Sequence, residues 1–548
     1  MATRATLFFL LATLDAAAAL STVTPVRTSA GQLLKSGGDE AAFIRSFCNA
    51  EECPPSLVDL KIPSDFPSGT YFRNGAGRFV AEDGTKAMHM FDGDGLMNAL
   101  TINEDGSVIF RNKFVQTSEF KADMEMGGFS ARGVFGTQKS GGILRNAFDM
   151  KTKHVANTNL ILCGDKLFAL WEGGSPYEMD PKTLETVGMR SDIADNFSAH
   201  PRYDPIKNVW VNFGVSDPDP AAGISRIQLY EQDADTGKIV SKPVSVTVPG
   251  VVLMHDMVLT ENYVVLSWNA CNLDSVGGLK ALLGVGAFAG ALALDEEGKH
   301  VIMCIPRTLL ETGAEDVDAL EDERIKRIEA PFSFAFHFGN GYEDEHGQLI
   351  FDRIETDDRK FDFGMSVAKK GKGKPLWEVV PWDDMEPYTL VRYQFDLEKE
   401  IMVERKVLCS SGSMEFPTIP QQLSTRPHKF LYTVASHDPS SKKQGFPGCW
   451  CKLDAFDGEI LASFAGEPYE VIGEPCLIPK VGGTGEDDAY LMAFLLNGRD
   501  LTSDVILLDA KTMNEVSRAR LPTFVPNGGL HGRYVEGATF DFDTVRGR

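Results

Sequence analysis

Short apolar runs separated by turn residues dominate the chain, and helix-type periodicity is scarce. Several segments repeat one pattern, in which an apolar run, a tight acidic turn and a second apolar run follow one another. They are residues 177–187, 230–240, 393–403, 453–461 and 507–516. Because Asp, Thr and Gly tolerate or cap a bent backbone, each segment predicts a β-hairpin.

The spacing of these hairpins indicates how the strands are organised. Their turn aspartates are Asp180, Asp233, Asp396, Asp457 and Asp509. Three of the intervals are about 50–60 residues, close to one propeller blade with its loops, and the fourth holds about three such units. The repeat is too loose for a WD40 or kelch protein. It still favours a propeller over a sandwich, since a sandwich of this length would need several domains and no linker is visible.

Composition and charge narrow the function classes. The chain has 548 residues, 43% of them hydrophobic, with 52 Gly and 28 Pro, which fits one large, turn-rich all-β domain over residues 41–548. The formal net charge of -24 makes nucleic acid an unsuitable partner. Any membrane contact must therefore be hydrophobic. The nine cysteines form no framework, and Cys449-Trp-Cys451 has one intervening residue instead of two, so we expect mostly free thiols.

The N-terminus resembles a targeting segment. Residues 1–19 combine a basic start, an apolar run and a row of alanines, which is typical of a secretory signal and too short for a membrane span. Residues 20–40 are rich in Ser and Thr and carry no acid before Asp39. They fit either a transit peptide of an alga with secondary plastids or a disordered start of a secreted protein.

One segment breaks the β pattern. Residues 279–294 are almost wholly apolar, yet they are too short to span a bilayer. They are either a buried helix or loop, or a patch that dips into a membrane near a substrate entrance. The residues that would form this patch are Leu279, Leu282, Leu283, Val285, Phe288 and Leu292.

Four of the ten histidines stand at predicted strand edges, namely His200, His255, His337 and His531. A single histidine in a β-protein is usually structural, and these spacings match no local metal motif such as H-E-x-x-H. They do suit a propeller, in which each blade can direct one inner-strand side chain toward the central axis.

The surroundings of these histidines resemble the four histidine motifs of the carotenoid cleavage oxygenase family. The histidine segments are Phe197-Ser-Ala-His-Pro-Arg-Tyr-Asp-Pro205, Met254-His-Asp-Met, Phe336-His-Phe-Gly-Asn-Gly-Tyr-Glu343 and Leu530-His-Gly-Arg-Tyr534. Further signatures follow in the order typical of the family: Gly69-Thr-Tyr-Phe-Arg-Asn-Gly75, His89-Met-Phe-Asp-Gly-Asp-Gly-Leu-Met97, Asn157-Thr-Asn-Leu-Ile, Leu170-Trp-Glu-Gly-Gly-Ser-Pro and Arg426-Pro-His-Lys-Phe-Leu-Tyr432. The resemblance covers roughly residues 55–548, and no histidine position departs from the pattern.

This resemblance implies a seven-bladed β-propeller with a helix and loop dome over its iron-bearing face. It also implies one Fe(2+) per chain, held by the four histidines with positions open for O2 and substrate. Ligating histidines need a partner on the other ring nitrogen, and the family assigns this role to Glu172, Glu415 and Glu474. Which glutamate serves which histidine stays open at this stage.

The implied reaction is cleavage of a C=C bond of a carotenoid or apocarotenoid by O2, giving two carbonyl products. Isomerisation or isomerohydrolysis of a carotenoid or retinoid, cleavage of a stilbenoid, and a binding scaffold with a vestigial metal site are the alternatives. Carotenoids reside in membranes, so the resemblance favours the membrane-facing interpretation of residues 279–294. It implies an enzyme on a membrane surface, and residues 1–40 predict entry into the secretory pathway and then a plastid or the secretory and endomembrane system.

Other candidate residues lead to no chemistry. Asp92-Gly-Asp-Gly95 lacks the spaced acids of an EF-hand and predicts a turn. His346 falls in an acidic run and is expected to face solvent, and His428 is expected to be structural. The sequence contains no G-x-S-x-G elbow and no P-loop, which argues against hydrolase and nucleotide-driven chemistry.

Overall fold

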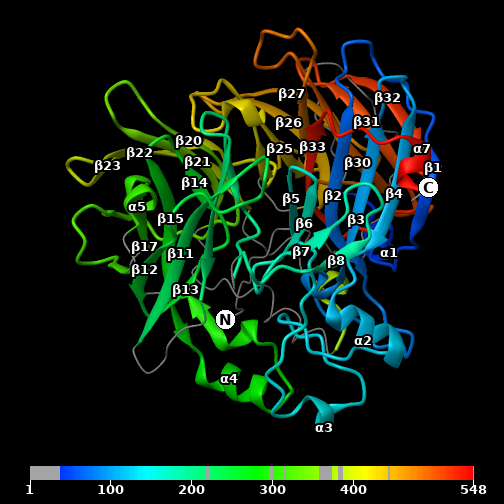
Figure 1. Cartoon of the computed structure of the whole chain (residues 1–548), viewed down its shortest axis with the longest axis horizontal. Helices are drawn as coiled ribbons and strands as arrows, with labels where there is room; N and C mark the ends of the chain where they lie inside the picture. Colours follow the sequence, from blue (N-terminus) through cyan, green and yellow to red (C-terminus); the bar gives the residue numbers. More distant parts are fainter. Residues whose placement is uncertain are drawn as a thin grey trace.

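The computed structural model describes residues 38–193, 196–216, 223–294, 300–313, 316–356, 373–379, 387–441 and 445–546. The protein is all-β, with few and short helices (Figure 1). Its described strands form seven sheets of four to six strands. We number the sheets 1 to 7 in chain order. Pairing is antiparallel throughout, except between β12 and β18.

The first three sheets lie in the N-terminal half of the chain, apart from two strands, β18 and β33. Sheet 1 contains β1 (Cys53–Leu57), β2 (Gly69–Arg78), β3 (Asp94–Ile102), β4 (Val108–Phe114) and the C-terminal β33 (Gly529–Glu536). Sheet 2 contains β5 (Asn159–Cys163), β6 (Lys166–Leu170), β7 (Tyr177–Met179) and β8 (Thr186–Met189). Sheet 3 contains β9 (Arg202–Asp204), β10 (Val209–Val215), β11 (Ile224–Asp233), β12 (Val244–Pro249) and β18 (Asp316–Asp318).

The remaining four sheets follow along the chain. Sheet 4 contains β13 (Val251–Leu253), β14 (Met257–Leu259), β15 (Tyr263–Leu273), β16 (Leu292–Leu294), β17 (His300–Pro306) and β19 (Lys326–Ala330). Sheet 5 contains β20 (Phe338–Glu343), β21 (Leu349–Glu355), β22 (Thr389–Asp396) and β23 (Ile401–Cys409). Sheet 6 contains β24 (Glu415–Thr418), β25 (Phe430–Ser436), β26 (Pro447–Asp454) and β27 (Ile460–Ala465). Sheet 7 contains β28 (Glu470–Ile472), β29 (Cys476–Pro479), β30 (Ala489–Asn497), β31 (Thr502–Asp509) and β32 (Glu515–Arg520).

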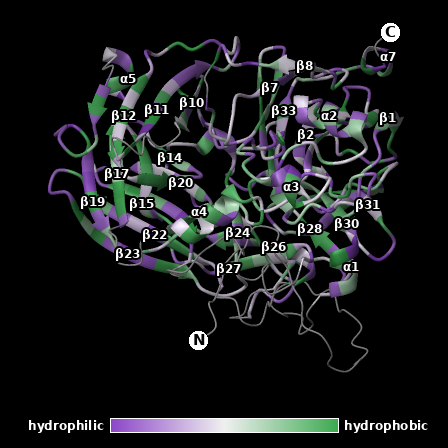
Figure 2. Cartoon of the chain, turned by 90° about the horizontal axis from the view of Figure 1, so that it is seen from below, coloured by the Kyte–Doolittle hydropathy of each residue, from purple (hydrophilic) through white to green (hydrophobic). Residues whose placement is uncertain are grey.

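The described helices are all short. They are α1 (Glu40–Arg45), α2 (Ser118–Met126), α3 (Ile143–Asn146), α4 (Ser275–Leu282), α5 (Thr308–Thr312) and α7 (Phe542–Val545), with 3-10 turns η1 (Met90–Asp92), η2 (Ala289–Ala291), η3 (Leu376–Glu378) and η5 (Gln421–Leu423). None of those helices has the length and apolar character needed to cross a bilayer. Figure 2 views the molecule from the side that carries α3 and α4.

The five predicted hairpins are confirmed, and each joins two neighbouring strands of one sheet. They connect β7 to β8, β11 to β12, β22 to β23, β26 to β27 and β31 to β32. At the start of each turn an aspartate accepts a backbone N–H, as Asp233 does from Thr236. In the fourth hairpin the residue in this place is Asp454, not Asp457, because Asp454 donates its N–H to the Glu459 carbonyl and so begins the turn.

The two ends of the described chain meet in sheet 1. Strand β33 pairs with β2, with Tyr534 opposite Tyr71, so the last strand joins a sheet built from the first ones (Figure 1). Helix α1 leads into this region and buries Phe43 completely. Residues 1–37, which contain the predicted signal and most of the predicted transit segment, lie outside the described residues.

Apolar side chains fill the spaces between neighbouring sheets. Sheets 3 and 4 share one cluster, which includes Val246 and Leu266, and sheets 4 and 5 share another, which includes Val265 and Phe351. All nine cysteines lie among the described residues and are free, as expected. The fold is therefore held by packing between sheets without disulfide cross-links.

Candidate metal centre

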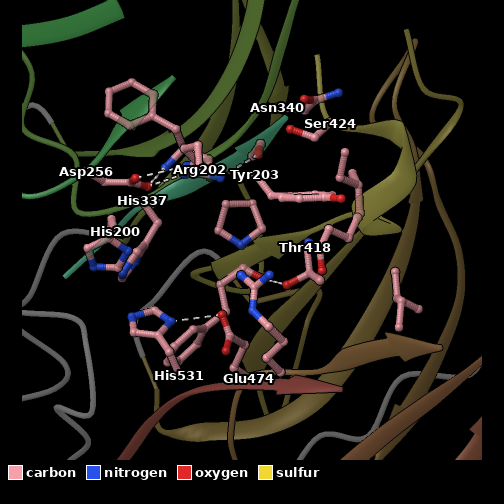
Figure 3. Close-up of a pocket in the computed structure, with 18 of the residues that line it drawn as sticks. His200, Arg202, Tyr203, Asp256, His337, Asn340, Thr418, Ser424, Glu474 and His531 are labelled. Atoms are coloured by element: carbon pink, nitrogen blue, oxygen red, sulfur yellow. Dashed lines mark hydrogen bonds and ion pairs between the residues drawn. The ribbon is translucent and has the colours of Figure 1, made fainter. Parts of the chain in front are cut away.

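The four predicted histidines converge on one point. The His200 ring centroid lies 4.3 Å from that of His255, 5.0 Å from that of His337 and 4.6 Å from that of His531. The Nε2 atoms of His255 and His337 are 3.4 Å apart. His200, His337 and His531 are buried, and His255 is slightly more open. Figure 3 shows three of these rings at one wall of a pocket.

Each histidine comes from a different sheet and stands close to the start of a strand at one edge of that sheet. His200 precedes β9 of sheet 3, His255 precedes β14 of sheet 4, and His337 precedes β20 of sheet 5. His531 lies near the start of β33 in sheet 1. Strand edges of four sheets thus bring together residues that are up to 331 positions apart in the chain.

The three predicted glutamates come from the other three sheets, and the structure pairs each with one histidine. Glu172, which follows β6, lies 2.5 Å from Nδ1 of His255. Glu415, the first residue of β24, lies 2.8 Å from Nδ1 of His337. Glu474, between β28 and β29, lies 2.9 Å from Nδ1 of His531. A carboxylate that accepts the Nδ1–H leaves the lone pair on Nε2, which then faces the centre of the cluster.

Burial tunes the protonation of the cluster. It lowers the pKa of His200 and that of His337 well below the usual 6.5, and the neighbouring histidines add to both shifts. Burial also raises the pKa of Glu415 well above 4.5, although the N–H that Phe416 donates acts in the opposite direction. Neutral imidazoles are the form in which histidine binds a metal.

The residues present fit a metal with nitrogen ligands. Nε2 of His200 is buried and has no hydrogen-bond partner among the described residues, which is costly unless a ligand occupies the centre. The ligating atoms of His200, His337 and His531 lie within 4.8 Å of one another. The potential ligand atoms of Glu172, His200 and His255 also lie within 4.8 Å of one another. The Glu172 carboxylate, however, faces Nδ1 of His255, on the far side of that ring from Nε2.

An apolar pocket adjoins the cluster on the side of His255 and His531. Its wall contains four aromatic side chains and one leucine, namely Phe91, Phe135, Trp171, Phe336 and Leu530. The buried Asp92 carboxylate fixes the loop that carries Phe135, because it accepts the N–H of Phe135 and both the N–H and the hydroxyl of Thr137. Asp92 ends η1 and supports this pocket, whereas the turn predicted at residues 92–95 is wrong for Asp94 and Gly95, which already belong to β3.

A second pocket adjoins the cluster on the side of His200, His337 and His531 (Figure 3). Polar side chains line it, including Arg202, Asp256, Asn340, Thr418 and Arg533. Sequence reasoning did not single out these residues, although Arg202, Asp256, Asn340 and Arg533 stand within three positions of a predicted ligand. That proximity is the signal that could have found them.

The apolar segment after the second histidine lies at the surface. Leu279, Leu282, Leu283 and Val285 have exposed side chains, whereas Phe288 and Leu292 are half-buried. Phe288 is covered because the Arg132 guanidinium lies 4.3 Å above its ring. The segment around α3 contributes further exposed residues that were not predicted: Ile143, Leu144, Phe148 and Met150.

Two other histidines have the surroundings expected of them. The His346 side chain is 73% exposed. His428 is buried, with Nε2 3.1 Å from the Asp352 carboxylate, away from the cluster.

Comparison with known proteins places this architecture in a family. Residues 46–536 match the family model described as retinal pigment epithelial membrane protein. Over 500 residues the chain is 31% identical to the apocarotenoid-15,15'-oxygenase of Synechocystis, which covers 87% of this chain and 92% of that protein. It is 26% identical to the resveratrol cleavage oxygenase 1 of Aspergillus fumigatus, over 82% of this chain and 85% of that protein. The solved structure of the cobalt-substituted Synechocystis oxygenase superposes with a TM-score of 0.78 at 28% identity, covering 91% of this chain and 99% of that one.

Proposed function

The chain belongs to the family of the retinal pigment epithelial membrane protein and the carotenoid cleavage oxygenases, and on that premise we propose that it is a dioxygenase that cleaves one C=C bond of a carotenoid or apocarotenoid. One observation carries the proposal. Four histidines, two of them held neutral by burial, converge at the wall of a pocket lined by Phe91, Phe135, Trp171 and Phe336. A metal centre open to an apolar cavity is what oxidation of a polyene requires.

The metal we propose is one Fe(2+) per chain, held by His200, His255, His337 and His531. Bound iron supplies the activation of O2 that a spin-paired polyene cannot provide by itself. Four neutral ligands leave the charge of the dication uncompensated in its immediate surroundings, which favours the ferrous state. The relative with bound cobalt supports a divalent first-row metal at this place in the family.

The residues of this chain contribute binding, orientation and exclusion of water. The aromatic side chains of the apolar pocket hold the polyene by contact with its flat π system. Asp92 fixes Phe135 through the backbone, and Glu172, Glu415 and Glu474 fix three imidazole rings. Leu530 and Phe336 close the wall beside the metal ligands and keep water from the reacting bond.

The reaction balances without a further reductant or proton donor. One C=C bond breaks, the O–O bond of O2 breaks, and two C=O bonds form, with one oxygen atom in each product. Isomerisation at the same site incorporates no oxygen from O2. The two reactions therefore differ in whether oxygen atoms from O2 enter the products.

Labelling with ¹⁸O2 tests the proposal. Iron-loaded protein is incubated with β-carotene, a xanthophyll, an apocarotenal and resveratrol in separate reactions, and the products are reduced with borohydride at once, because aldehyde oxygens exchange with water. We expect one ¹⁸O in each fragment of a carotenoid or apocarotenal. Unlabelled products of unchanged carbon number would establish isomerisation instead, and cleavage of resveratrol alone would make the enzyme a stilbenoid oxygenase.

We also propose that residues 41–548 form a single seven-bladed β-propeller with a dome of loops and helices over the metal. Each of the seven sheets contributes one residue of the set of four histidines and three glutamates. Apolar clusters join neighbouring sheets, including sheets 1 and 2 through Phe72 and Leu167. Pairing of β33 with β2 would close the ring, as it joins both ends of the chain in one sheet.

The exposed apolar side chains point to a membrane as the source of substrate. We propose that α3 and α4 with their flanking loops form an apolar platform that docks on the surface of a lipid bilayer. It comprises Ile143, Leu144, Phe148, Met150, Val276, Leu279, Leu282, Leu283 and Val285. The N–H of Phe148 donates to the carbonyl of Leu282 at 2.7 Å, so the two segments lie side by side (Figure 1). Contiguous exposed apolar surface is rare on monomeric proteins and marks an interaction site.

Arg132 supports this platform from beneath. Its buried guanidinium donates to the carbonyls of Asp149, Ala281 and Gly286 at 2.7–2.9 Å. It therefore ties the α3 segment to the α4 segment. Phe135, three residues later, lines the apolar pocket, which supports a platform beside the route that a lipid-soluble polyene would take.

Targeting remains a proposal as well. We propose that residues 1–19 direct the chain into the secretory pathway and that residues 20–40 then lead it to a plastid or leave it in the endomembrane system. A fluorescent protein fused behind residues 1–40 tests this. Fluorescence in the plastid supports the transit segment, fluorescence in secretory compartments supports a signal alone, and cytosolic fluorescence contradicts both.

A further inference from the structure

One of the four histidines lacks the partner that the other three have. His255, His337 and His531 each direct Nδ1 at a glutamate. The described sheets supply three such glutamates, and each of them is paired with one of the other three histidines. His200 is anchored by its backbone, whose N–H donates to the Ser198 hydroxyl at 2.9 Å.

Arg202, two residues after His200, contacts the chain segments that contain two other predicted ligands, His255 and His337. The Arg202 guanidinium forms a two-pronged ion pair with Asp256, the residue that follows His255 (Figure 3). It also donates to the carbonyl of Phe338, the residue that follows His337, at 2.8 Å, and to that of Gly339 at 3.2 Å. The Arg202 side chain thus links the segment of His200 to the segments of His255 and His337.

Asp256 makes the matching contacts from the other side of the pair. Its carboxylate accepts the N–H of Phe338 at 2.9 Å and that of Met257 at 2.7 Å. The Asp256 side chain has no exposed surface, and Arg202 is 25% exposed at the edge of the polar pocket. A buried carboxylate with a two-pronged arginine partner and two N–H donors has its charge compensated and is held in one geometry.

These contacts matter because backbone pairing does not connect the three segments that contain His200, His255 and His337. Strands β9, β14 and β20 belong to sheets 3, 4 and 5, and no strand ladder joins one of these sheets to another among the described residues. Packing of apolar side chains fixes the spacing of sheets but tolerates small sliding movements. A metal site needs its ligands within a fraction of an ångström.

We propose that the Arg202–Asp256 pair is a positioning device that sets the registration of His200, His255 and His337 around the metal, and takes the place of the missing fourth glutamate. The proposal rests on the proposed metal centre. Arg202 and Asp256 bind no metal themselves. They act through the backbone of the three histidine segments, so their loss lowers the affinity for the metal and distorts its coordination.

The chain offers a matched control. Arg392 forms the same two-pronged pair with Asp352, with Nε–Oδ1 and Nη2–Oδ2 distances of 2.7 Å, and the Asp352 side chain is likewise fully buried. These two residues stand opposite each other within sheet 5, on strands that the backbone ladder already joins. R392K therefore removes the same chemistry from a pair within one sheet, and it leaves the contact of Asp352 with His428 outside that sheet in place.

The experiment compares R202K and R392K with the wild type. Affinity for Co²⁺ is measured by competition with a chelator, the visible absorption of the cobalt complex reports its geometry, and chemical denaturation reports stability. We expect R202K to bind Co²⁺ about 10- to 100-fold more weakly, the range typical of groups that orient metal ligands, with an altered spectrum. We expect R392K to keep the affinity and spectrum of the wild type.

Two outcomes overturn the proposal: wild-type affinity and spectrum in R202K, or equal losses of affinity in R202K and R392K, which would make the effect one of general stability. If R202K does not fold, hydrogen exchange of the wild type decides. We expect the metal to slow exchange of the Phe338 and Met257 amides, which donate to Asp256, and unchanged exchange would refute the coupling. Absence of Co²⁺ binding by the wild type would instead contradict the proposed metal centre.

Discussion

The two pockets that flank the histidine cluster differ in chemistry. On the side of His255 and His531 the wall is mainly aromatic and aliphatic, with Asn157, Thr158 and Glu172 among its polar members, and on the other side it contains Arg202, Asp256, Asn340 and Arg533 beside apolar side chains such as Phe416. An extended polyene gains more contact energy on the first side, because the second offers a larger share of charged groups that would lose their hydrogen bonds. The comparison therefore assigns substrate binding to one pocket and ligand positioning to the other.

Loss of one metal ligand should abolish both metal binding and cleavage, whichever pocket binds the substrate. We expect this change to have the largest effect. In His337→Ala the metal loses one imidazole and Glu415 loses its partner, so we expect iron content near background and no cleavage. Iron per chain and product formation are measured together. His346→Ala is the matched control, since that side chain is 73% exposed and away from the cluster. Full activity in His337→Ala without iron would refute the proposed function.

A charge placed on the apolar side should separate metal binding from substrate binding. We expect Phe135→Asp to keep its iron and to lower kcat/KM for an apocarotenal by about 100-fold, because a carboxylate beside the polyene must lose water without gaining a partner. Thr418→Val, on the polar side, should leave kcat/KM within a few-fold of the wild type. If the two variants gave equal losses, the assignment of the substrate to the apolar pocket would be wrong.

The apolar platform should matter for delivery of the substrate and not for the metal. We expect Leu144→Asp combined with Phe148→Asp to lower partition onto phosphatidylcholine vesicles by about tenfold or more, since two exposed apolar side chains no longer enter the bilayer. Iron content should not change. Phe456→Asp, at a side chain that is 77% exposed on the hairpin between β26 and β27, is the control. Equal binding by all variants would contradict docking through the platform.

The smallest effect concerns His154, which packs behind the apolar pocket with its ring 4.7 Å from that of Trp171. Burial lowers its pKa to about 4. Below pH 6.5 the unfolded chain therefore takes up a proton that the folded protein refuses, and stability falls as the pH falls from 6.5 toward 4.

This loss can be measured by denaturation at pH 6.5 and pH 5.5. We expect His154→Gln to reduce the loss by roughly 1 kcal/mol over that unit of pH, close to the limit for one group. His346→Gln should leave the loss unchanged. An unaltered pH dependence in His154→Gln would show that water reaches the His154 side chain behind Trp171, contrary to an apolar pocket that excludes water.

Much of the fold and the site could be predicted from the sequence, for reasons that differ between residues. The hairpins follow from local turn chemistry, which needs no knowledge of the rest of the chain. In the fourth hairpin Asp457 lies in the turn, but Asp454, three residues earlier, takes the place of the other four turn aspartates, since two aspartates fit the same pattern. The four histidines could be located only because ordered motifs surround each of them. Their spacing alone carried no metal signature.

Relations between distant segments could not be predicted. The pairing of Glu172 with His255, or of Arg202 with Asp256, depends on which sheets are neighbours, and one sequence does not contain that information. The platform was predicted from residues 279–294 alone, because Ile143 and Leu144 form too short an apolar run to stand out. Phe288 was expected in the exposed patch, yet it is half-buried beneath Arg132, which approaches from a segment more than 150 residues earlier in the chain.

A measurement of the ligands bound to the iron is the strongest test of the proposed four-histidine centre. X-ray absorption of the iron-loaded protein, together with metal analysis, gives the number of imidazole ligands and the number of metal ions per chain. We expect one iron with four imidazole nitrogens and no carboxylate from the protein, since Glu172, Glu415 and Glu474 all contact Nδ1 atoms. A spectrum with fewer than four imidazoles, with a glutamate oxygen bound to the iron, or with no bound iron would contradict it.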